Sequence, residues 1–395
     1  MLILARGRQG EGMGEPYFTR NEYDARLASV QRKMTGRDLD LLLLSAPENI
    51  FYLTGLDHWG YFSPHILVVP VAGEMTLIAR SMEKVTVANQ VSNARFVGHA
   101  DHESAADGFF CVLDDSGCQP KRIGIEAWSS GLPHGLALVL QRHTPSAQWL
   151  DVGGLVDELR LVKSAAEQAW LRQAARVSDA GASAAIAATR AGVTERQVAA
   201  ACEHAMIEAG GTYPGFGPFI RSTSRLGEEH TTWSDTRLAV GDALFLELSG
   251  CVAHYHAPLG RLIHVGHAPK GAHEMAAVAQ GAFEAVLGSL KDGALARDVY
   301  AAWQLVVDRA GMPDFRRHHC GYAVGIGFPP SWTGGNKVTG LRRDSEMPIR
   351  TGMSFHVLSW LMGTGRGDFF ISNAVLLGES GPEVLTRTPA GVTIV

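Results

Sequence analysis

The 395-residue sequence lacks the features that mark several large classes of protein. It has no apolar stretch of the roughly 20 residues that a membrane-spanning helix needs, and its apolar start is far shorter than the core of a signal peptide. It has no block of Lys and Arg, and its formal net charge is -5, whereas nucleic acids and anionic membranes attract concentrated positive charge. We therefore expect a cytoplasmic protein that binds neither nucleic acid nor membrane.

Cysteine is scarce, and its spacing disfavours two further kinds of site. The five cysteines are odd in number and include no CxxC pair, which argues against a zinc knuckle and against a disulfide framework. We expect buried, reduced thiols at Cys111, Cys118, Cys202, Cys251 and Cys320.

The chain does contain enough apolar material for sizeable cores. Apolar residues make up 46% of it and charged residues 19%, and its length favours two domains over one. Alternating helix and strand patterns predict a smaller α/β domain at 18–155, preceded by a flexible arm at 1–17. Separate runs of helices and strands predict an α+β domain at 156–395.

Capping signals place two helices at the start of the second domain. Ser164 and Glu167 form an S-x-x-E capping box before a long helix, for which Gly192 is a plausible C-terminal stop. Thr194 and Gln197 repeat the box for a second helix, and further helical patterns cover about 270–290 and 294–311. Strand patterns lie between and after these helices.

One carboxylate stands out in the stretch FLELSGCVAHYHAPLGRL at 245–262. The stretch predicts a strand, a glycine turn and a second strand, with Glu247 inside an otherwise apolar run. A buried Glu is costly without a partner, so Glu247 either pairs with an arginine such as Arg261 or has a chemical role. We favour the chemical role.

Six segments, taken in order, resemble the creatinase/prolidase family, also called the M24 peptidase or pita-bread family. They are YLTG at 52–55, ELRLVKSAAE at 158–167, His230 followed eleven residues later by GD at 241–242, the 245–262 hairpin, GYAVGIG at 321–327 and GMSF at 352–355. The resemblance implies a creatinase-like N-terminal domain and a pita-bread catalytic domain. It also implies a homodimer.

The resemblance also marks where metal-dependent members hold two metal ions. In this chain those places fall on Glu247, Pro258, Tyr322, Leu358 and Ser372. Pro and Leu have no donor atom, Tyr and Ser are rare divalent-metal ligands, and one carboxylate cannot hold a dinuclear centre. We therefore expect no metal and no other cofactor.

Within the family the chain is most similar to ectoine hydrolases, through YLTGLDHW, EEHTTW, ELSGCVAHYHAPLGR, GYAVGIGFPPSW and GMSFH. This resemblance implies that ectoine, or hydroxyectoine, is opened to an N-acetylated diaminobutyrate, with Glu247 attacking the amidine carbon and His230 transferring protons. An amidinium carbon is electrophilic without a Lewis acid, which agrees with the loss of metal ligands. The chain departs from this subgroup near Asn373, where an acidic residue is expected.

Other activities stay open. Creatinase itself matches less well, because its two active-site glutamates would fall on Gly260 and Ser372. A metal-dependent Xaa-Pro dipeptidase or aminopeptidase, a creatinase-like amidinohydrolase and a catalytically inactive binding module are the alternatives. The expected ligand is in any case a small cationic or zwitterionic molecule.

Further side chains are candidates for binding that molecule. Aromatic faces stabilise cations, and interdomain packing is the alternative reading for the aromatic candidates. Arg221 or Arg261 could bind a substrate carboxylate, although an ion-pair role is favoured for each. The glycines at 321–327 favour a tight loop close to the ligand. The substrate-binding candidates are Trp59, Tyr61, Phe62, Arg221, His256, Tyr322 and Trp332.

Overall fold

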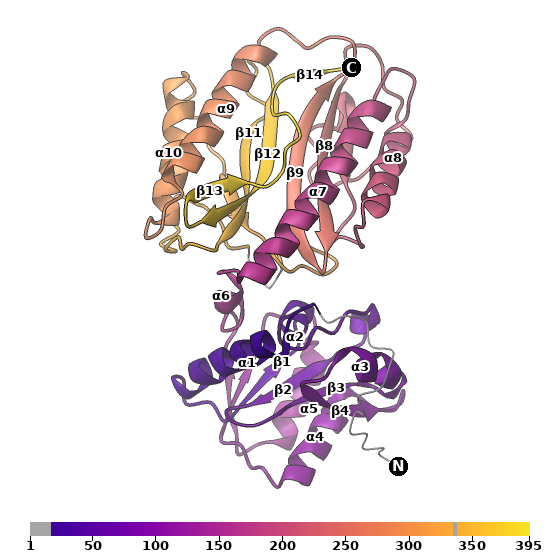
Figure 1. The fold of residues 1–395 in the computed structure, drawn as a ribbon, viewed down its shortest axis with the longest axis vertical. Helices are drawn as coiled ribbons and strands as arrows, with labels where there is room; N and C mark the ends of the chain where they lie inside the picture. The colour runs from indigo at the N-terminus through magenta and orange to yellow at the C-terminus, as the bar shows by residue number, and fades with distance from the viewer. Residues whose placement is uncertain (1–16, 335–337) are drawn as a thin grey trace. The chain divides into compact units, whose positions relative to one another are not determined.

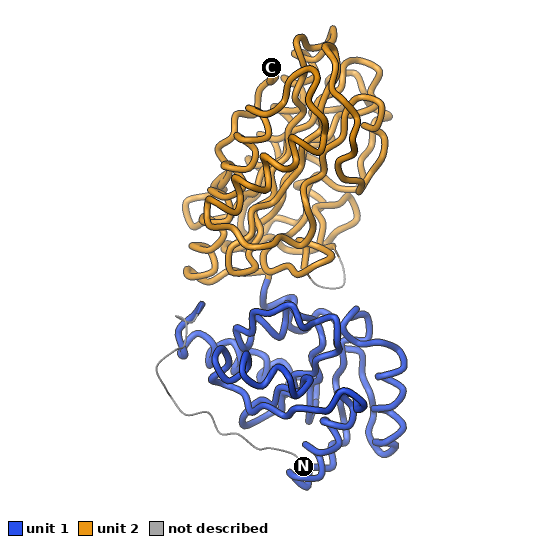
Figure 2. The backbone as a smooth tube through the Cα atoms, turned by 90° about the vertical axis from the view of Figure 1, so that its right-hand side faces the viewer, with its two compact units in different colours: residues 1–160, 335–337 blue, residues 161–334, 338–395 orange. Residues whose placement is uncertain are grey.

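The computed structural model describes residues 17–334 and 338–395. The chain divides into two compact units at Arg160 (Figure 2). The flexible arm expected at 1–17 lies, apart from Tyr17, outside the described residues. Within the described ranges, no helix combines the length and apolar character needed to cross a membrane.

The N-terminal unit is a mixed six-stranded sheet with helices packed against it (Figure 1). The strand order is β4-β3-β2-β1-β5-β6, and helices alternate with most of the strands along the chain. The elements are α1 (Arg20–Thr35), β1 (Leu41–Leu44), α2 (Pro47–Thr54), β2 (Ile66–Pro70), β3 (Met75–Arg80), α3 (Lys84–Gln90), β4 (Ala94–His99), α4 (Ala105–Ser116), β5 (Arg122–Ile125), α5 (His134–His143), β6 (Gln148–Asp151) and α6 (Asp157–Arg160).

A buried carboxylate holds the start of α2. Glu126, just after β5, accepts hydrogen bonds from the backbone N–H groups of Ser45 and Ala46 at 2.7 and 2.9 Å, and also from the amide of Asn49. Burial raises the pKa of Glu126 to about 7. Because α2 has no side-chain cap of its own, Glu126 supplies the acceptor that its first N–H groups need.

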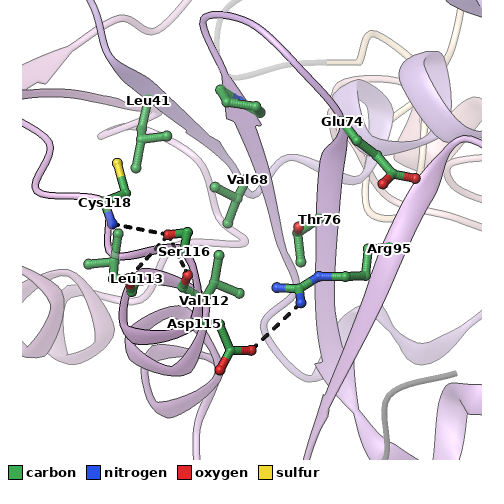
Figure 3. A pocket seen from close by; sticks show the side chains of 11 residues that line it. Leu41, Val68, Glu74, Thr76, Arg95, Val112, Leu113, Asp115, Ser116 and Cys118 are labelled. Atoms are coloured by element: carbon green, nitrogen blue, oxygen red, sulfur yellow. Dashed lines mark hydrogen bonds and ion pairs between the residues drawn. The ribbon is translucent and has the colours of Figure 1, made fainter. Parts of the chain in front are cut away.

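The N-terminal unit also contains a cavity of about 380 Å³ between the sheet and the C-terminal end of α4 (Figure 3). Its walls include Val68 and Val112, and a loose ion pair between Arg95 and Asp115, 3.6 Å apart, lies beside them. None of the candidate site residues lines it.

The C-terminal unit is built on an eight-stranded sheet whose main order is β10-β11-β12-β9-β8-β7 (Figure 1). Two short strands pair beside this path, β13 with β12 and β14 with β9. The elements are α7 (Ala165–Ala188), α8 (Glu195–Glu208), β7 (Phe219–Ser222), β8 (Ala243–Val252), β9 (Tyr255–His264), α9 (Ala272–Ser289), α10 (Ala296–Arg309), β10 (Gly321–Ala323), β11 (Ser354–Leu361), β12 (Phe369–Gly378), β13 (Gly381–Val384) and β14 (Thr393–Ile394).

Both predicted capping boxes are confirmed, but the predicted stop of the long helix is wrong. Ser164 caps α7 and Thr194 caps α8, each with the reciprocal bond from the residue three positions on. Helix α7 ends at Ala188, because Thr189 turns to an extended conformation and its hydroxyl bonds the carbonyl of Ala185. Gly192, with φ of +86°, lies in the turn that leads to α8.

Side-chain alternation gives the C-terminal sheet two different faces. Leu244, Leu246 and Leu248 pack in the core with α7 and α8, while α9 and α10 cover β11 and β12 in a second core. Phe245 and Glu247 therefore point to the other face of the sheet. We call that opposite face the site face.

The expected glycine turn in the 245–262 hairpin is corrected by the structure. The turn is made by Ala253 and His254, both with positive φ, whereas Gly250 lies inside β8. A Cβ at Gly250 would come within 2.3 Å of the carbonyl oxygen of Ala174 on α7. The glycine is therefore needed for the close approach of the helix to the sheet.

Candidate active site

Strand register brings the site residues together from four strands. Glu247 on β8 lies opposite Phe219 on β7 and Gly260 on β9, and Gly260 in turn lies opposite Ser372 on β12. A Cβ at Gly260 would stand 2.2 Å from the ring of Phe370 and 2.7 Å from Ser372 Oγ. A side chain at Gly260 would therefore clash with Phe370 and Ser372, and the glycine lets these two residues pack against β9 beside Glu247.

The carboxyl group of Glu247 is almost enclosed. Only 8% of the residue is exposed, and burial raises its pKa to about 7. The charges of Arg221 and Arg317 act in the opposite direction, while Glu229 adds to the rise. A carboxyl group with such a pKa changes its charge near neutral pH.

A histidine that we did not predict lies beside Glu247. His356 Nε2 is 3.8 Å from Glu247 Oε1 and 2.7 Å from Ser372 Oγ, and its Nδ1 is 2.8 Å from the hydroxyl of Tyr322. That hydroxyl accepts a hydrogen bond from the indole N–H of Trp332 at 3.0 Å. A continuous hydrogen-bonded chain on the site face thus links Trp332, Tyr322, His356 and Ser372.

The direction of this chain follows from the chemistry of its members. Burial holds the pKa of His356 well below its usual range and that of Tyr322 well above, so both are neutral. Trp332 can only donate to Tyr322, and of the two partners only His356 can accept the phenol proton. His356 Nδ1 is therefore the acceptor, and Nε2–H donates to Ser372 with Glu247 within reach.

This arrangement predicts opposite effects for two substitutions. Replacing His356 by Phe removes the N–H near Glu247 and should raise the pKa of Glu247, whereas Ser372→Ala removes the competing acceptor and should lower it, each by about one unit. The carboxyl band in infrared difference spectra, recorded against pH and assigned with Glu247→Gln, measures both. A shift of the same sign in the two variants would contradict the arrangement.

Aromatic side chains surround this chain. Trp332 is 1% exposed, and its ring centroid lies 3.9 Å from that of Phe216 and 5.8 Å from that of Phe219. Phe219 is the residue whose backbone lies opposite Glu247. Ring faces stabilise cations, so this cluster suits a positively charged ligand held by Glu247.

His230 lies in the loop that follows β7 and is exposed, with φ of +54°. Its ring centroid is 5.9 Å from that of Phe219, in an edge-to-face arrangement. Phe219 therefore neighbours both His230 and Glu247. The catalytic role of His230 stays a prediction.

All three polar candidates from β7 and β9 contact protein groups, and two of them are arginines. The Arg221 guanidinium lies 4.3 Å over the ring of Phe245 and donates to the carbonyl of Glu228, and it is 2% exposed. Arg261 points to the opposite face, where it donates to the carbonyls of Ser372 and Pro389. Arg261 is therefore not the partner of Glu247.

His256 is the third of these candidates, and both of its ring nitrogens are engaged. Nδ1 is 2.9 Å from the carbonyl of His254, and Nε2 accepts the backbone N–H of Gly215 at 2.9 Å. Burial lowers its pKa to about 3, so the ring is neutral. These bonds hold the 215 loop to the sheet.

Asn373 and the later glycines of the GYAVGIG segment contact other parts of the protein, and not the ligand site for which the sequence suggested them. Asn373, at the position where an acid was expected, accepts hydrogen bonds from Arg261 and Thr386 on the face away from Glu247. The GYAVGIG segment begins as strand β10, and its later glycines allow close approach of Lys163 to Gly325 and of the Trp332 backbone to Gly327. These glycines thus serve protein packing.

The aromatic candidates of the N-terminal unit lie in the loop after α2. Trp59 is 63% exposed and Phe62 is 79% exposed. Tyr61 packs its ring against those of His58 and His65, with centroids 4.7 and 4.9 Å away. Their contact with the substrate stays a prediction.

A sheet with paired helices on one face and a carboxylate, a histidine and aromatic rings on the other defines an α+β enzyme of the pita-bread type. The model of metallopeptidase family M24 matches residues 169–379, and that of the creatinase/prolidase N-terminal domain matches residues 26–162. The chain belongs to metallopeptidase family M24. The predicted family and fold class are confirmed, and the protein is a hydrolase.

Relatives within the family have different activities. An ectoine hydrolase of Halomonas elongata is 26% identical over 390 residues, which cover 94% of this chain and 97% of the relative. An Xaa-Pro dipeptidase of Pyrococcus horikoshii is 24% identical over 357 residues, 90% of this chain and 95% of the relative. The structure of an Xaa-Pro dipeptidase from Bacillus anthracis superposes with a TM-score of 0.82 at 20% identity, over 94% of this chain and 100% of that one.

The family implies a divalent metal, which the residues of this chain do not fit. No cluster of three or more His, Cys, Asp or Glu side chains in residues 17–334 and 338–395 is placed to hold a metal ion. At the expected ligand positions, Pro258 and Leu358 offer no donor, and Tyr322 and Ser372 are bonded to His356.

Proposed function

We propose that the protein is a metal-independent hydrolase that opens a small cyclic amidine, ectoine or hydroxyectoine, to an N-acetylated diaminobutyrate. The observation that carries the proposal is Glu247, one enclosed carboxylate beside aromatic rings at a site whose other ligand positions have no acidic side chain. The likeness to an ectoine hydrolase over nearly the whole chain supports the same substrate class.

The reaction begins when ionised Glu247 attacks the amidinium carbon. A carbon–oxygen bond forms, and the ring carbon–nitrogen bond then breaks as His230 in its protonated form gives a proton to the leaving nitrogen. The product of this step is a cationic imidate ester of Glu247 with a free amine at the other end of the opened ring.

Water completes the reaction. A water molecule adds to the same carbon, and neutral His230 accepts one of the water protons. The bond between this carbon and Glu247 then breaks as the amide forms. The second water proton goes to solvent, and the amine takes up a proton from solvent. The N–H of His356 can turn from Ser372 to the oxygen of Glu247 that regains negative charge, because it lies 3.8 Å away. The net change is the addition of one water molecule.

A second candidate is a metal-dependent Xaa-Pro dipeptidase. Family membership and the Xaa-Pro dipeptidase relative favour it. A neutral peptide carbonyl needs a metal ion or an oxyanion hole, however, and the donor set opposes the metal. A creatinase-like amidinohydrolase is a third reading, which a cationic substrate also suits.

One experiment separates these candidates. Protein dialysed against a chelator is incubated with ectoine and, separately, with an Xaa-Pro dipeptide or creatine, and the products are followed by proton NMR. We expect ring opening of ectoine at an undiminished rate and no cleavage of the other two. Activity that disappears with the chelator and returns with manganese, cobalt or zinc would overturn the proposal.

A further inference from the structure

A second guanidinium group lies near Glu247, and the reaction described above does not use it. Arg317 belongs to the segment between α10 and β10. Its carbonyl accepts a hydrogen bond from the hydroxyl of Tyr300 at 2.6 Å, and its guanidinium carbon lies 4.7 Å from the ring centroid of Trp360 on β11. Both the backbone and the charged end of the side chain are thus held in place.

The ion pair that Arg317 makes is loose. Its NH1 is 3.7 Å from Oε1 of Glu229, beyond hydrogen-bond distance, and the two side chains are 22% and 51% exposed. Arg225 nearby is bound much more tightly, at 2.6 Å to Glu195 and 3.0 Å to Glu228. A guanidinium group offers five N–H donors, so Arg317 can exchange Glu229 for a better carboxylate partner.

The position of Arg317 fits the second charge of a zwitterion. Arg317 and Glu247 interact electrostatically. The Trp360 ring, over which the Arg317 guanidinium lies, packs against Phe245, two residues before Glu247, with 5.3 Å between the ring centroids. When the cationic carbon of a compact ligand lies at Glu247, the guanidinium of Arg317 is therefore available to bind the carboxylate of that ligand. Arg221 is 2% exposed, so its charge instead compensates that of Glu247.

We propose that Arg317 binds the carboxylate of the substrate and makes the enzyme selective for cyclic amidines that carry one. This inference rests on the proposed function. When substrate binds, its carboxylate takes the place of Glu229 at the guanidinium group, and no covalent bond changes. Glu229 holds Arg317 in position in the free enzyme.

Two compounds and two variants test this role. The compounds are ectoine and the same ring without its carboxylate, 2-methyltetrahydropyrimidine. For Arg317→Gln we expect KM for ectoine to rise about ten- to hundredfold, with KM for the other compound within about twofold of the wild-type value, because a charge-assisted bond is lost only with ectoine. Arg316→Gln, which removes an exposed neighbouring charge paired with Asp308, should leave both values unchanged. Equal effects of Arg317→Gln on both compounds would overturn the inference.

A third variant and a binding measurement complete the test. Glu229→Gln removes the competing carboxylate and should lower KM for ectoine alone, which a merely structural role of Arg317 does not predict. Calorimetric titration of both compounds separates the two proposals. If ectoine binds selectively without being turned over, and Arg317→Gln loses this binding, the inference is supported and the proposed reaction is refuted. If ectoine is turned over but binding is not selective for it, the proposed reaction is supported and the inference is refuted. Absence of binding overturns both.

Discussion

Replacing Glu247 by Gln is expected to abolish turnover while the protein stays folded. The amide has the shape of the carboxyl group but cannot attack the amidinium carbon, so kcat should fall by about ten-thousand-fold or more, as happens when other catalytic nucleophiles are removed. The rate of ectoine ring opening, followed by NMR, measures the loss. Glu208→Gln, an exposed change on α8 with the same loss of charge, is the matched control and should keep the wild-type rate.

The same variant has a predictable effect on stability. Because the pKa of Glu247 is raised from its ordinary 4.5 to about 7 in the folded state, the folded protein binds the extra proton between these values. Stability of the wild type should therefore fall by about 3 kcal/mol as pH rises through this window, and Glu247→Gln should lack this part of the decrease. Urea denaturation of both proteins at several pH values gives the difference. Parallel curves would show that Glu247 is not enclosed in solution, and an active variant would refute its role as nucleophile.

Local sequence signals determined much of the architecture. The capping boxes at Ser164 and Thr194 start α7 and α8, and the apolar run around Glu247 forms β8, because these signals act through neighbours within a few residues. The burial of Glu247 was also predicted, from the apolar run in which it lies. The predictions for the end of α7 and for the hairpin turn were wrong. Thr189 ends the helix, and Ala253 and His254 form the turn with positive φ, where glycines were expected.

The rest of the candidate site depends on contacts between distant segments. His356 meets Glu247 only because β11, β12, β9 and β8 are neighbours in the sheet, and no spacing in the sequence expresses that order. A signal was nevertheless present, since strand alternation places residue 356 on the same face as Leu358, an expected ligand position. Arg317 gave no such signal, because it lies outside any strand.

The proposed action on a charged substrate agrees with the chemistry of the site. Two of the residues at the expected ligand positions, Tyr322 and Ser372, are the partners of His356, so a neutral hydrogen-bonded chain stands where the family holds charged ligands. Such a chain leaves Glu247 as the attracting charge for a cation. A metal centre at the same place would repel that cation.

The second large effect is expected for His230→Ala. Loss of the group that transfers protons to the leaving nitrogen and from water should lower kcat by about a hundredfold or more and leave KM for ectoine nearly unchanged. Because His230 is exposed, added imidazole can reach the space left by its side chain and should restore part of the rate, with a pH dependence that follows the imidazole.

This rescue distinguishes proton transfer from a structural role of the loop. His204→Ala, an exposed histidine on α8, serves as the control and should neither lose activity nor respond to imidazole. A variant that retains the wild-type rate would remove His230 from the mechanism and leave His356, 3.8 Å from Glu247, as the imidazole close to the reacting carboxylate. A large loss that imidazole does not restore, with KM increased in parallel, would instead assign His230 to substrate binding, because an added base replaces a proton carrier and cannot rebuild a contact.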